Sequence, residues 1–287
     1  MDYKIVRANN KESLEQKISE LLKEGWRVKG AKHSKSYGDE DYTFYQPMIK
    51  DQEGTPKVYV TGDTHGTHDI QKLLTFSKGK GKDLTKNDYV IILGDTGILW
   101  GKDRKHNAKM KRIFENFPWT TLIVDGNHDD HDQLQNLLMM PMFNDVVGEM
   151  FEDSVYHLKR GIVYHINGKK FWVMGGALSV DREYRTEGVN WWAGELLSKA
   201  DEDKGFVYLD VWDDKVDYIL THTCPSSHAT KIKDAANWRH KQTDPTSKYL
   251  QKVFDSTEFD KWYCGHWHID QELDGINFLY KDIVEIK

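Results

Sequence analysis

VYVTGDTHGTHD, residues 58–69, carries the strongest structural signal in the chain. A β-branched apolar run leads to a glycine, which is typical of a buried strand that ends in a tight turn. Asp63, His65, His68 and Asp69 then follow within seven positions. Carboxylate and imidazole groups are common protein ligands of transition metals. The stretch therefore predicts a strand that delivers several potential metal ligands to one loop.

Strands and helices alternate along the chain after this first strand. YVIILG (89–94) and TTLIVDG (120–126) are near-continuous apolar runs, as expected of strands buried on both faces. Helices are expected near 69–78 and 104–116, and such alternation predicts parallel strands joined by right-handed crossovers. A second sheet is predicted by four later runs, GIVYHI, KFWVMGG, VDYILTH and KWYCGH. The fold class is therefore α/β.

The first fifty residues predict a domain of their own. YKIVRA (3–8) alternates as a strand, and KESLEQKISELLKEG (11–25) has an apolar helical face. Two further strands complete a small β-α-β-β unit over residues 1–50. DQEGTP (51–56) has the composition of a linker, and the main domain is expected over 57–287. The N-terminal unit resembles small domains of unknown function that precede some bacterial and phage enzymes.

Composition narrows the function classes. A formal net charge of −6 argues against a binder of long nucleic acid, which needs a basic surface. MDYKIVRANN has no apolar core of a signal sequence, and no stretch reaches the roughly 18–20 apolar residues of a membrane helix. Only Cys224 and Cys264 are present, so we expect a cytoplasmic protein without membrane attachment. Each cysteine could make activity oxidation-sensitive or could be a buried packing residue.

Potential ligands follow the end of each predicted strand. They are Asp63, His65, Asp95, Asn127, His128, His222, His266 and His268. In open α/β sheets, sites form beyond the carboxyl ends of the strands, so these side chains should converge. They are too many for one tetrahedral ion but suit two ions that share a bridging carboxylate. The mixture of imidazole and carboxylate predicts two divalent ions, with Mn as first choice and Fe, Zn or Ni as alternatives.

Five motifs in order resemble those of the calcineurin-like metallophosphoesterases of bacteria and phages. They are GDTHG, GD (94–95), GNHDD, THTCPSS and GHWH, and the resemblance runs from about residue 57 to 270. It implies a four-layer α-β-β-α sandwich of two mixed sheets. One metal would be held by Asp63, His65, Asp95 and His268. The other would be held by Asp95, Asn127, His222 and His266, with Asp95 as the bridge.

The resemblance also implies a mechanism. Two cations can generate a bridging hydroxide that attacks phosphorus directly. Asp95 and His128 are the expected catalytic residues, with His128 facing the substrate to stabilise its oxygens or protonate the leaving group. The expected substrate is a small phosphate ester or nucleotide. The alternatives are a phosphodiesterase or nuclease for cyclic or short nucleotides, and a vestigial metal-binding adaptor that recruits a partner through the N-terminal domain.

The second motif departs from the phosphoprotein-phosphatase branch. That branch has Asp-Arg after its GD motif, where this chain has Ile98 and Leu99. The segment GGALSVDREYRTEGVNWWAGE (175–195) offers a replacement, because an arginine fork matches phosphate. Arg185 is the preferred phosphate clamp and Arg182 the second choice, alongside Asn127 and His128. The alternative is that the two tryptophans are core residues and the arginines form surface ion pairs.

Two minor expectations concern polar residues outside the ligand set. Residues 201–217 are acidic and contain DEDKG, which favours an exposed turn. The other polar residues near the motifs are expected to cap or solvate the helices that follow. These residues are His68, Asp69, Asp129, Asp130 and His131.

Overall fold

The computed structural model describes residues 2–28, 33–36, 42–50, 55–101, 103–236 and 243–287. The chain divides into two compact units, Met1–Pro56 and Lys57–Lys287. Of the predicted linker 51–56, residues 51–54 lie outside the described residues. Among the described residues, no helix combines the length and apolar character needed to cross a bilayer.

The N-terminal unit is a small α+β domain. Its elements are β1 (Asp2–Ala8), α1 (Lys11–Lys23), β2 (Arg27–Val28), β3 (His33–Ser36) and β4 (Tyr42–Lys50). The long β4 pairs antiparallel with each of the other three strands. The side chain of Asn10 accepts a hydrogen bond from the Ser13 amide at 2.8 Å and so caps α1. Leu14 and Ile18 of the helix form an apolar core with Met48 of β4.

The main unit begins with a seven-stranded sheet in the order β17-β5-β6-β7-β10-β9-β8. Its strands are β5 (Val58–Thr61), β6 (Tyr89–Leu93), β7 (Thr120–Val124), β8 (Leu138–Met142), β9 (Asp145–Phe151), β10 (Val155–Leu158) and β17 (Ile283–Ile286). β5, β6, β7 and β10 are parallel, and antiparallel strands extend both edges. The helices of this half are α2 (Gln71–Lys78), α3 (Arg104–Glu115) and α4 (His131–Gln135). Leu73 and Phe114 on α2 and α3 pack with Ile92 of β6.

A six-stranded sheet follows in the order β11-β12-β13-β14-β16-β15. Its strands are β11 (Ile162–Ile166), β12 (Lys169–Met174), β13 (Lys215–Thr221), β14 (Glu258–Cys264), β15 (Gln271–Leu273) and β16 (Ile276–Phe278). The helices are α5 (Lys199–Asp210), α6 (Ser226–Ala235) and α7 (Pro245–Ser256), with short 3₁₀ turns η1 (Arg182–Tyr184) and η2 (Ala193–Glu195). Leu209 of α5 and Leu250 of α7 pack with Trp172 of β12.

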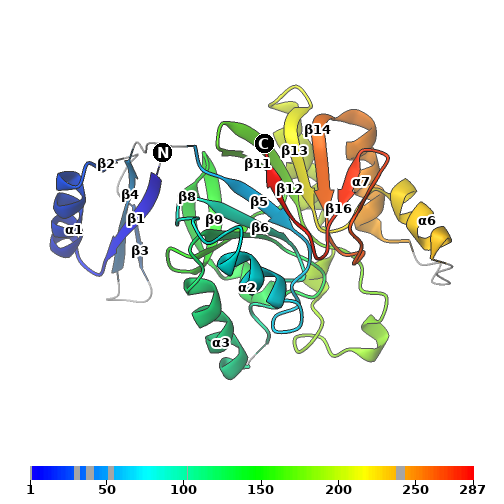
Figure 1. Cartoon of the computed structure of the whole chain (residues 1–287), viewed down its shortest axis with the longest axis horizontal. Helices are drawn as coiled ribbons and strands as arrows, with labels where there is room; N and C mark the ends of the chain where they lie inside the picture. Colours follow the sequence, from blue (N-terminus) through cyan, green and yellow to red (C-terminus); the bar gives the residue numbers. More distant parts are fainter. Residues whose placement is uncertain (1, 29–32, 37–41, 51–54, 102, 237–242) are drawn as a thin grey trace. The chain divides into compact units, whose positions relative to one another are not determined.

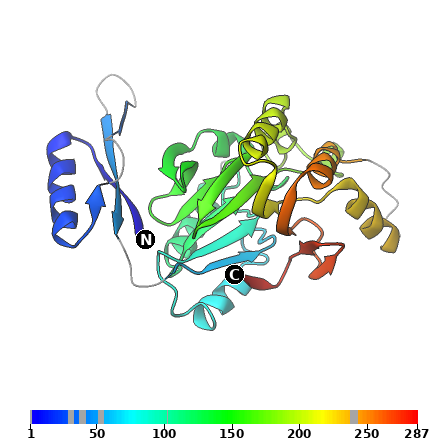
Figure 2. The same cartoon turned by 90° about the horizontal axis from the view of Figure 1, so that it is seen from above.

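The two sheets lie face to face with helices on the outside (Figures 1 and 2). Each sheet buries one face beneath helices, yet residues on the other face are buried as well. Val60, Leu93 and Leu220 have no exposed surface, so the inner faces cover each other. Both sheets contain parallel and antiparallel pairs. The predicted α-β-β-α sandwich of two mixed sheets is confirmed, preceded by the small N-terminal unit.

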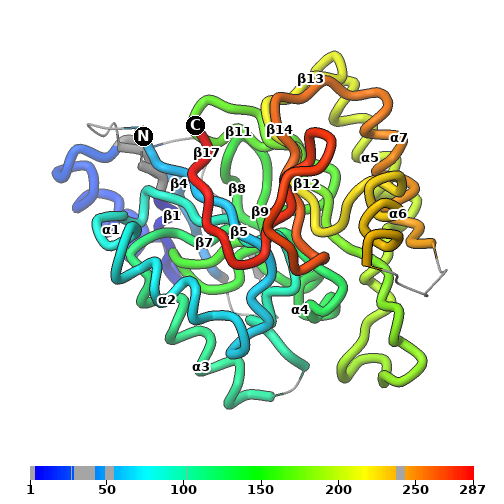
Figure 3. The backbone as a smooth tube through the Cα atoms, turned by 45° about the vertical axis from the view of Figure 1, so that its right-hand side comes forward, coloured from blue at the N-terminus to red at the C-terminus, as the bar shows by residue number. Residues whose placement is uncertain are grey.

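The first sheet is completed at one edge by a strand from the far end of the main unit. The last strand, β17, pairs antiparallel with β5, which begins the main unit more than 200 residues earlier. In Figure 3 the red C-terminal segment runs beside the start of this unit. The loop between β16 and β17 is thereby held against the carboxyl end of β5, where the first ligand motif lies, and its Leu279 carbonyl leaves no room for a Cβ at Gly62.

The predicted turn within residues 201–217 is wrong for most of its length. α5 extends from Lys199 to Asp210. The Ser198 hydroxyl accepts a hydrogen bond from the Asp201 amide, and the Asp201 carboxylate accepts one from the Ser198 amide, each at 3.1 Å. This reciprocal capping box starts a helix, and the Ser-x-x-Asp pattern could have indicated it.

Candidate metal centre

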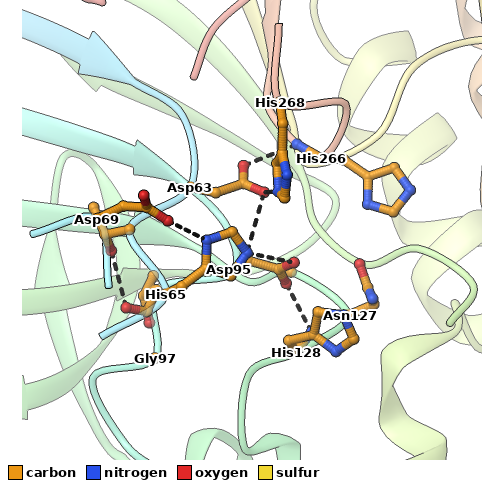
Figure 4. A network of polar contacts seen from close by, with 12 residues as sticks. Asp63, His65, Asp69, Asp95, Gly97, Asn127, His128, His266 and His268 are labelled. Atoms are coloured by element: carbon orange, nitrogen blue, oxygen red, sulfur yellow. Dashed lines mark hydrogen bonds and ion pairs between the residues drawn. The ribbon is translucent and has the colours of Figure 1, made fainter. Parts of the chain in front are cut away.

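Two groups of potential metal ligands lie at the carboxyl ends of the parallel strands. One group contains Asp63, His65 and His268, and the other contains Asp95, His222 and His266. Within each group the ligand atoms lie within 4.8 Å of one another. Figure 4 shows Asp63, His65, Asp95 and His268 around a common space, with Asn127 and His128 on the far side of Asp95.

Asp63 organises the first group from a fully buried position. Its Oδ2 lies 3.0 Å from Nε2 of His268 and 3.8 Å from Nε2 of His65. Its Oδ1 accepts a hydrogen bond from the backbone amide of His266 at 2.8 Å. Gly265 must be a glycine, because a Cβ there would lie 2.4 Å from that same Oδ1. The first and last motifs are therefore packed directly against each other.

Asp95 stands between the two groups and presents one oxygen to each. Its Oδ2 lies 3.7 Å from Nε2 of His65, and its Oδ1 lies 3.4 Å from Nε2 of His222. The Oδ1 atom also accepts a hydrogen bond from the backbone amide of His128 at 2.7 Å. Each oxygen of this buried carboxylate therefore faces a different group of candidate ligands.

The second group is oriented by hydrogen bonds on the far side of its ligands. Nδ1 of the buried His222 donates to the Leu93 carbonyl at 2.6 Å, which leaves Nε2 facing the site. The Asn127 amide nitrogen donates to the Ser179 hydroxyl at 3.1 Å. Its Oδ1 therefore points inward and lies 3.0 Å from Nε2 of His222. Outer contacts of this kind fix the tautomer and direction of metal ligands.

The charges of the site fit divalent cations. Burial opposes the ionised form of Asp95, but His222 and then His65 hold its pKa well below the usual range. Burial likewise opposes the charged form of His65, yet contact with Asp95 and Asp63 raises its pKa to about 9. Burial also opposes the charged form of His222, but Asp95 and then Asp63 raise its pKa to about 10. Protonated imidazoles thus supply the positive charge that the buried carboxylates need, and bound cations would take over that role.

Four of the candidate ligands occupy strained backbone conformations. The φ angles of His65, Asp95, His266 and His268 are 41°, 45°, 66° and 51°. Left-handed backbone is uncommon for residues other than glycine and tends to concentrate at functional sites. It persists here because neighbouring groups restrain it: the Asp95 carbonyl, for example, accepts the His65 amide at 2.8 Å.

Asp69 orients His65, a role that the sequence analysis missed. Its Oδ2 accepts a hydrogen bond from Nδ1 of His65 at 2.8 Å, and its Oδ1 accepts one from the Tyr280 hydroxyl at 3.0 Å. The expectation that Asp69 caps the following helix is wrong, because α2 has no side-chain cap. The arrangement matches the carboxylate–histidine pairs that support metal ligands. The His-x-x-x-Asp spacing is the only sequence signal for it.

Asp129 joins two of the ligand loops. It is 2 % exposed, and its Oδ1 accepts hydrogen bonds from the Thr96 amide at 2.9 Å, the Thr96 hydroxyl at 2.6 Å and the Gly97 amide at 3.3 Å. Its Oδ2 accepts one from the Gly126 amide at 2.8 Å. The expectation that Asp129 caps or solvates a helix is therefore wrong. It holds the loop after β6 against the loop after β7.

The other polar residues near the motifs have different structural roles. Asp130 caps α4 as predicted, since its Oδ1 accepts the Gln133 amide at 3.0 Å. His131 was expected to be a solvated or capping residue, but it is buried, and its Nε2 donates to the Gly126 carbonyl at 2.9 Å. His68 is exposed. Lys72, which the sequence did not single out, donates to the carbonyls of Gly62 at 2.9 Å and Asp63 at 2.7 Å.

An arginine lies beside His128. The Arg185 NH2 atom lies 3.5 Å from Nε2 of His128. Asp181 holds this guanidinium through two contacts of 2.7 Å, and its NH1 donates to the Asn190 carbonyl at 3.0 Å. Burial lowers the pKa of His128, and the Arg185 charge adds to that effect although Asp95 opposes it.

The segment that carries Arg185 agrees in part with the alternative from the sequence. Arg185 does form an ion pair with Asp181, and Trp192 is a buried core residue. Arg182 is exposed and lines neither of the two cavities beside the site. Of the two arginines, only Arg185 reaches the ligand cluster.

Both cysteines are buried, and burial raises their pKa values, which favours packing over redox chemistry.

Two cavities open beside the ligand cluster. The larger has a volume of about 780 Å³ and extends from His266 towards α6 and the start of α7. The smaller has a volume of about 380 Å³ and extends towards Trp100 and Arg185. His65, Asp95 and His128 line both cavities.

The family comparison agrees with this architecture. The family described as calcineurin-like phosphoesterase matches residues 56–270. Residues 1–51 match a separate domain of unknown function, DUF1737, so the expected N-terminal domain is confirmed. No curated protein matches the sequence. Among solved structures, a protein of unknown function from Aquifex aeolicus is 16 % identical, covers 58 % of this chain and 80 % of its own, and gives a TM-score of 0.30.

Proposed function

The chain belongs to the calcineurin-like phosphoesterase family, and from this we propose that it hydrolyses a small phosphate ester or nucleotide with two divalent metal ions. The observation that carries the proposal is the position of Asp95. Its two oxygens face two separate groups of ligands, and each group combines a buried carboxylate with imidazoles. Paired ions with one shared carboxylate account for this arrangement.

The proposed ligand sets follow the two groups. Asp63, His65, Asp95 and His268 would hold one ion, and Asp95, Asn127, His222 and His266 would hold the other. When bound, such ions lower the pKa of water towards neutrality and stabilise charge on phosphoryl oxygens. Mn is the first choice, with Fe, Zn or Ni as alternatives, because nitrogen and oxygen ligands are mixed.

His128 is the proposed catalytic side chain that faces the substrate. Its lowered pKa keeps the ring neutral near pH 7. Because the Arg185 guanidinium can only donate, the facing Nε2 of His128 is the acceptor and the ring proton lies on Nδ1. A neutral ring is a poor source of protons but a good hydrogen-bond donor. Stabilisation of a phosphoryl oxygen by Nδ1–H is therefore favoured over protonation of the leaving group.

Arg185 is the proposed second contact with phosphate. Its Nε and NH2 groups are engaged by Asp181, and NH1 donates one hydrogen to Asn190. One N–H of NH1 remains available, together with the positive charge. The pair of Asp181 and Arg185 would thus supply, from the segment after β12, the Asp and Arg that are replaced by Ile98 and Leu99 in the second motif. An arginine held in place by a carboxylate loses little entropy when it binds.

Hydrolysis assays with single metals test the proposal. Chelated and dialysed protein should hydrolyse 4-nitrophenyl phosphate or its bis ester only after Mn or another of the proposed ions is restored. Asp95→Asn should abolish that activity, whereas Asp132→Asn, an exposed residue on α4, should leave it unchanged. Metal binding without hydrolysis of any ester would instead favour the adaptor, whose site holds ions but performs no reaction.

A further inference from the structure

We propose that the substrate is a phosphodiester whose two organic groups occupy the two cavities that meet at the ligand cluster. This inference rests on the proposed phosphoesterase function and names its substrate class. A monoester carries one organic group and would leave one cavity filled with water. A diester carries two groups that diverge from one phosphorus, and the site offers a separate space for each.

The two cavities share some lining residues but extend along different halves of the sandwich. Both are lined by His65, Asp95 and His128. The larger runs over α6 and α7, which cover the second sheet. The smaller runs towards Trp100 and the start of α3, which covers the first sheet. A phosphate bound at the shared residues would therefore have one open space on each side.

Both cavities are large enough for an organic group. Volumes of about 780 Å³ and 380 Å³ fall within the usual range of roughly 300–1,000 Å³ for small-molecule sites. A nucleoside fits the larger space, and a single ring or a short chain fits the smaller one.

The linings differ in chemistry and so assign the two groups. The larger cavity is lined by the hydroxyl-bearing residues Ser226, Thr230 and Ser247 and by Trp267, whose ring could stack against a base. Asp181, Asp234 and Asp244 also line it, against Lys233 as its lysine among the described residues, and this acidic balance disfavours an additional negative charge there. Hydroxyl and carboxylate groups suit a neutral substituent with hydroxyls of its own, such as the sugar of a nucleoside. We therefore place the nucleoside in the larger cavity.

The smaller cavity is lined by bases and an aromatic ring. His68, His106, Arg185 and Trp100 contribute to it, and Asp95 is its only carboxylate among the described residues. This lining suits an aromatic or negatively charged group through ring contacts and charge. Since Arg185 lines this cavity and not the larger one, the group that leaves with developing negative charge belongs here.

The reaction balances without a further reagent. The oxygen of water forms a bond to phosphorus, and the bond from phosphorus to the leaving oxygen breaks. The water gives up one proton as it bonds to phosphorus, and the leaving oxygen takes up one proton and departs as an alcohol, so that the nucleoside monophosphate remains. No oxidant or reductant takes part.

Blocking each cavity separately tests the inference. Thr230 and Thr67 are exposed and line the larger and the smaller cavity respectively. Thr230→Trp and Thr67→Trp should each lower kcat/KM for thymidine 5′-(4-nitrophenyl) phosphate at least tenfold. For 4-nitrophenyl phosphate, whose ring occupies only the leaving-group side, Thr67→Trp alone should do so. Thr75→Trp, an exposed position on α2 that lines neither cavity, is the matched control.

Calorimetric binding of thymidine 5′-monophosphate to the manganese-loaded protein adds a readout that needs no turnover. Thr230→Trp should weaken this binding at least tenfold and Thr67→Trp less than twofold. Unfolding temperatures of the variants confirm that each one folds. Preference for the monoester together with unchanged diester hydrolysis in both variants would overturn the inference. Absence of hydrolysis of every ester would overturn the proposed function, while equal binding in all variants would overturn the cavity assignment by itself.

Discussion

Replacing Asp129 tests whether its hydrogen bonds hold the ligand loop after β6 against the ligand loop after β7. Asp129→Ala would leave the buried amides of Thr96, Gly97 and Gly126 and one hydroxyl without their acceptor. Each buried polar group left unsatisfied costs about 1–3 kcal/mol. The Thr96 hydroxyl can rotate, and the 3.3 Å contact of Gly97 is weak. We therefore expect a loss of roughly 3–6 kcal/mol, a large share of the roughly 5–15 kcal/mol that stabilises a typical domain.

The milder variant Asp129→Asn separates the contribution of the Gly126 hydrogen bond from that of the Thr96 hydrogen bonds. Its amide oxygen can still accept from Thr96, but its NH2 group cannot accept from Gly126, so about 1–3 kcal/mol should be lost. Urea unfolding of the metal-free protein at pH 8, followed by tryptophan fluorescence, measures both values. Burial and Asp95 raise the pKa of Asp129 to about 6, so the carboxylate is ionised at that pH. Asp132→Ala is the control, and a loss below about 1 kcal/mol for Asp129→Ala would refute the reasoning.

Three further predictions concern ligand orientation, pH and phosphate contact. Asp69→Asn should weaken manganese binding about 10–100-fold by releasing His65, measured by calorimetry, with Asp83→Asn as control; unchanged affinity would remove the orienting role. Burial lowers the pKa of His131 to about 4 in the folded protein, whereas a histidine in the unfolded chain has a pKa of about 6.5. As the pH falls, the unfolded chain is therefore protonated at this residue before the folded protein is. The stability that His131 contributes is therefore fully present above pH 6.5 and lost as the pH falls towards 4, by up to about 3 kcal/mol, and His131→Gln should lack this part of the pH dependence in urea unfolding. Arg185→Ala should lower kcat/KM about 10–100-fold, whereas Arg182→Ala should leave it within twofold; equal effects of the two in steady-state assays would contradict the phosphate clamp.

The strands and the ligand loops could be predicted because their signals are local. Apolar runs such as YVIILG identify strands, and polar residues at the carboxyl ends of parallel strands must meet at one edge. The two-sheet sandwich could be predicted from the family resemblance and from the four later apolar runs that indicated a second sheet. The structure placed the ligands of each predicted set near one another for the same reason: each follows a strand whose position in the sheet is fixed by its neighbours.

Contacts made across long stretches of chain could not be predicted. Asp129 accepts hydrogen bonds from residues more than thirty positions away, and β17 pairs with β5 from the opposite end of the main unit. A carboxylate in a loop between a strand and a helix looks the same in sequence whether it caps the helix or joins two loops. Asp130 and Asp129 are adjacent and have these two different roles. The α5 error has another cause, because the acidic composition of residues 201–205 outweighed a capping signal that was present at Ser198.

Metal stoichiometry tests the central claim most directly. The wild-type chain, dialysed against a chelator and then equilibrated with Mn²⁺, should retain two ions per chain by elemental analysis. Asp95→Asn should retain fewer than one, because its position serves both groups, and Asp132→Asn should retain two. A wild-type protein that binds one ion or none, or an Asp95→Asn variant that keeps both, would contradict a shared carboxylate at the centre of this site.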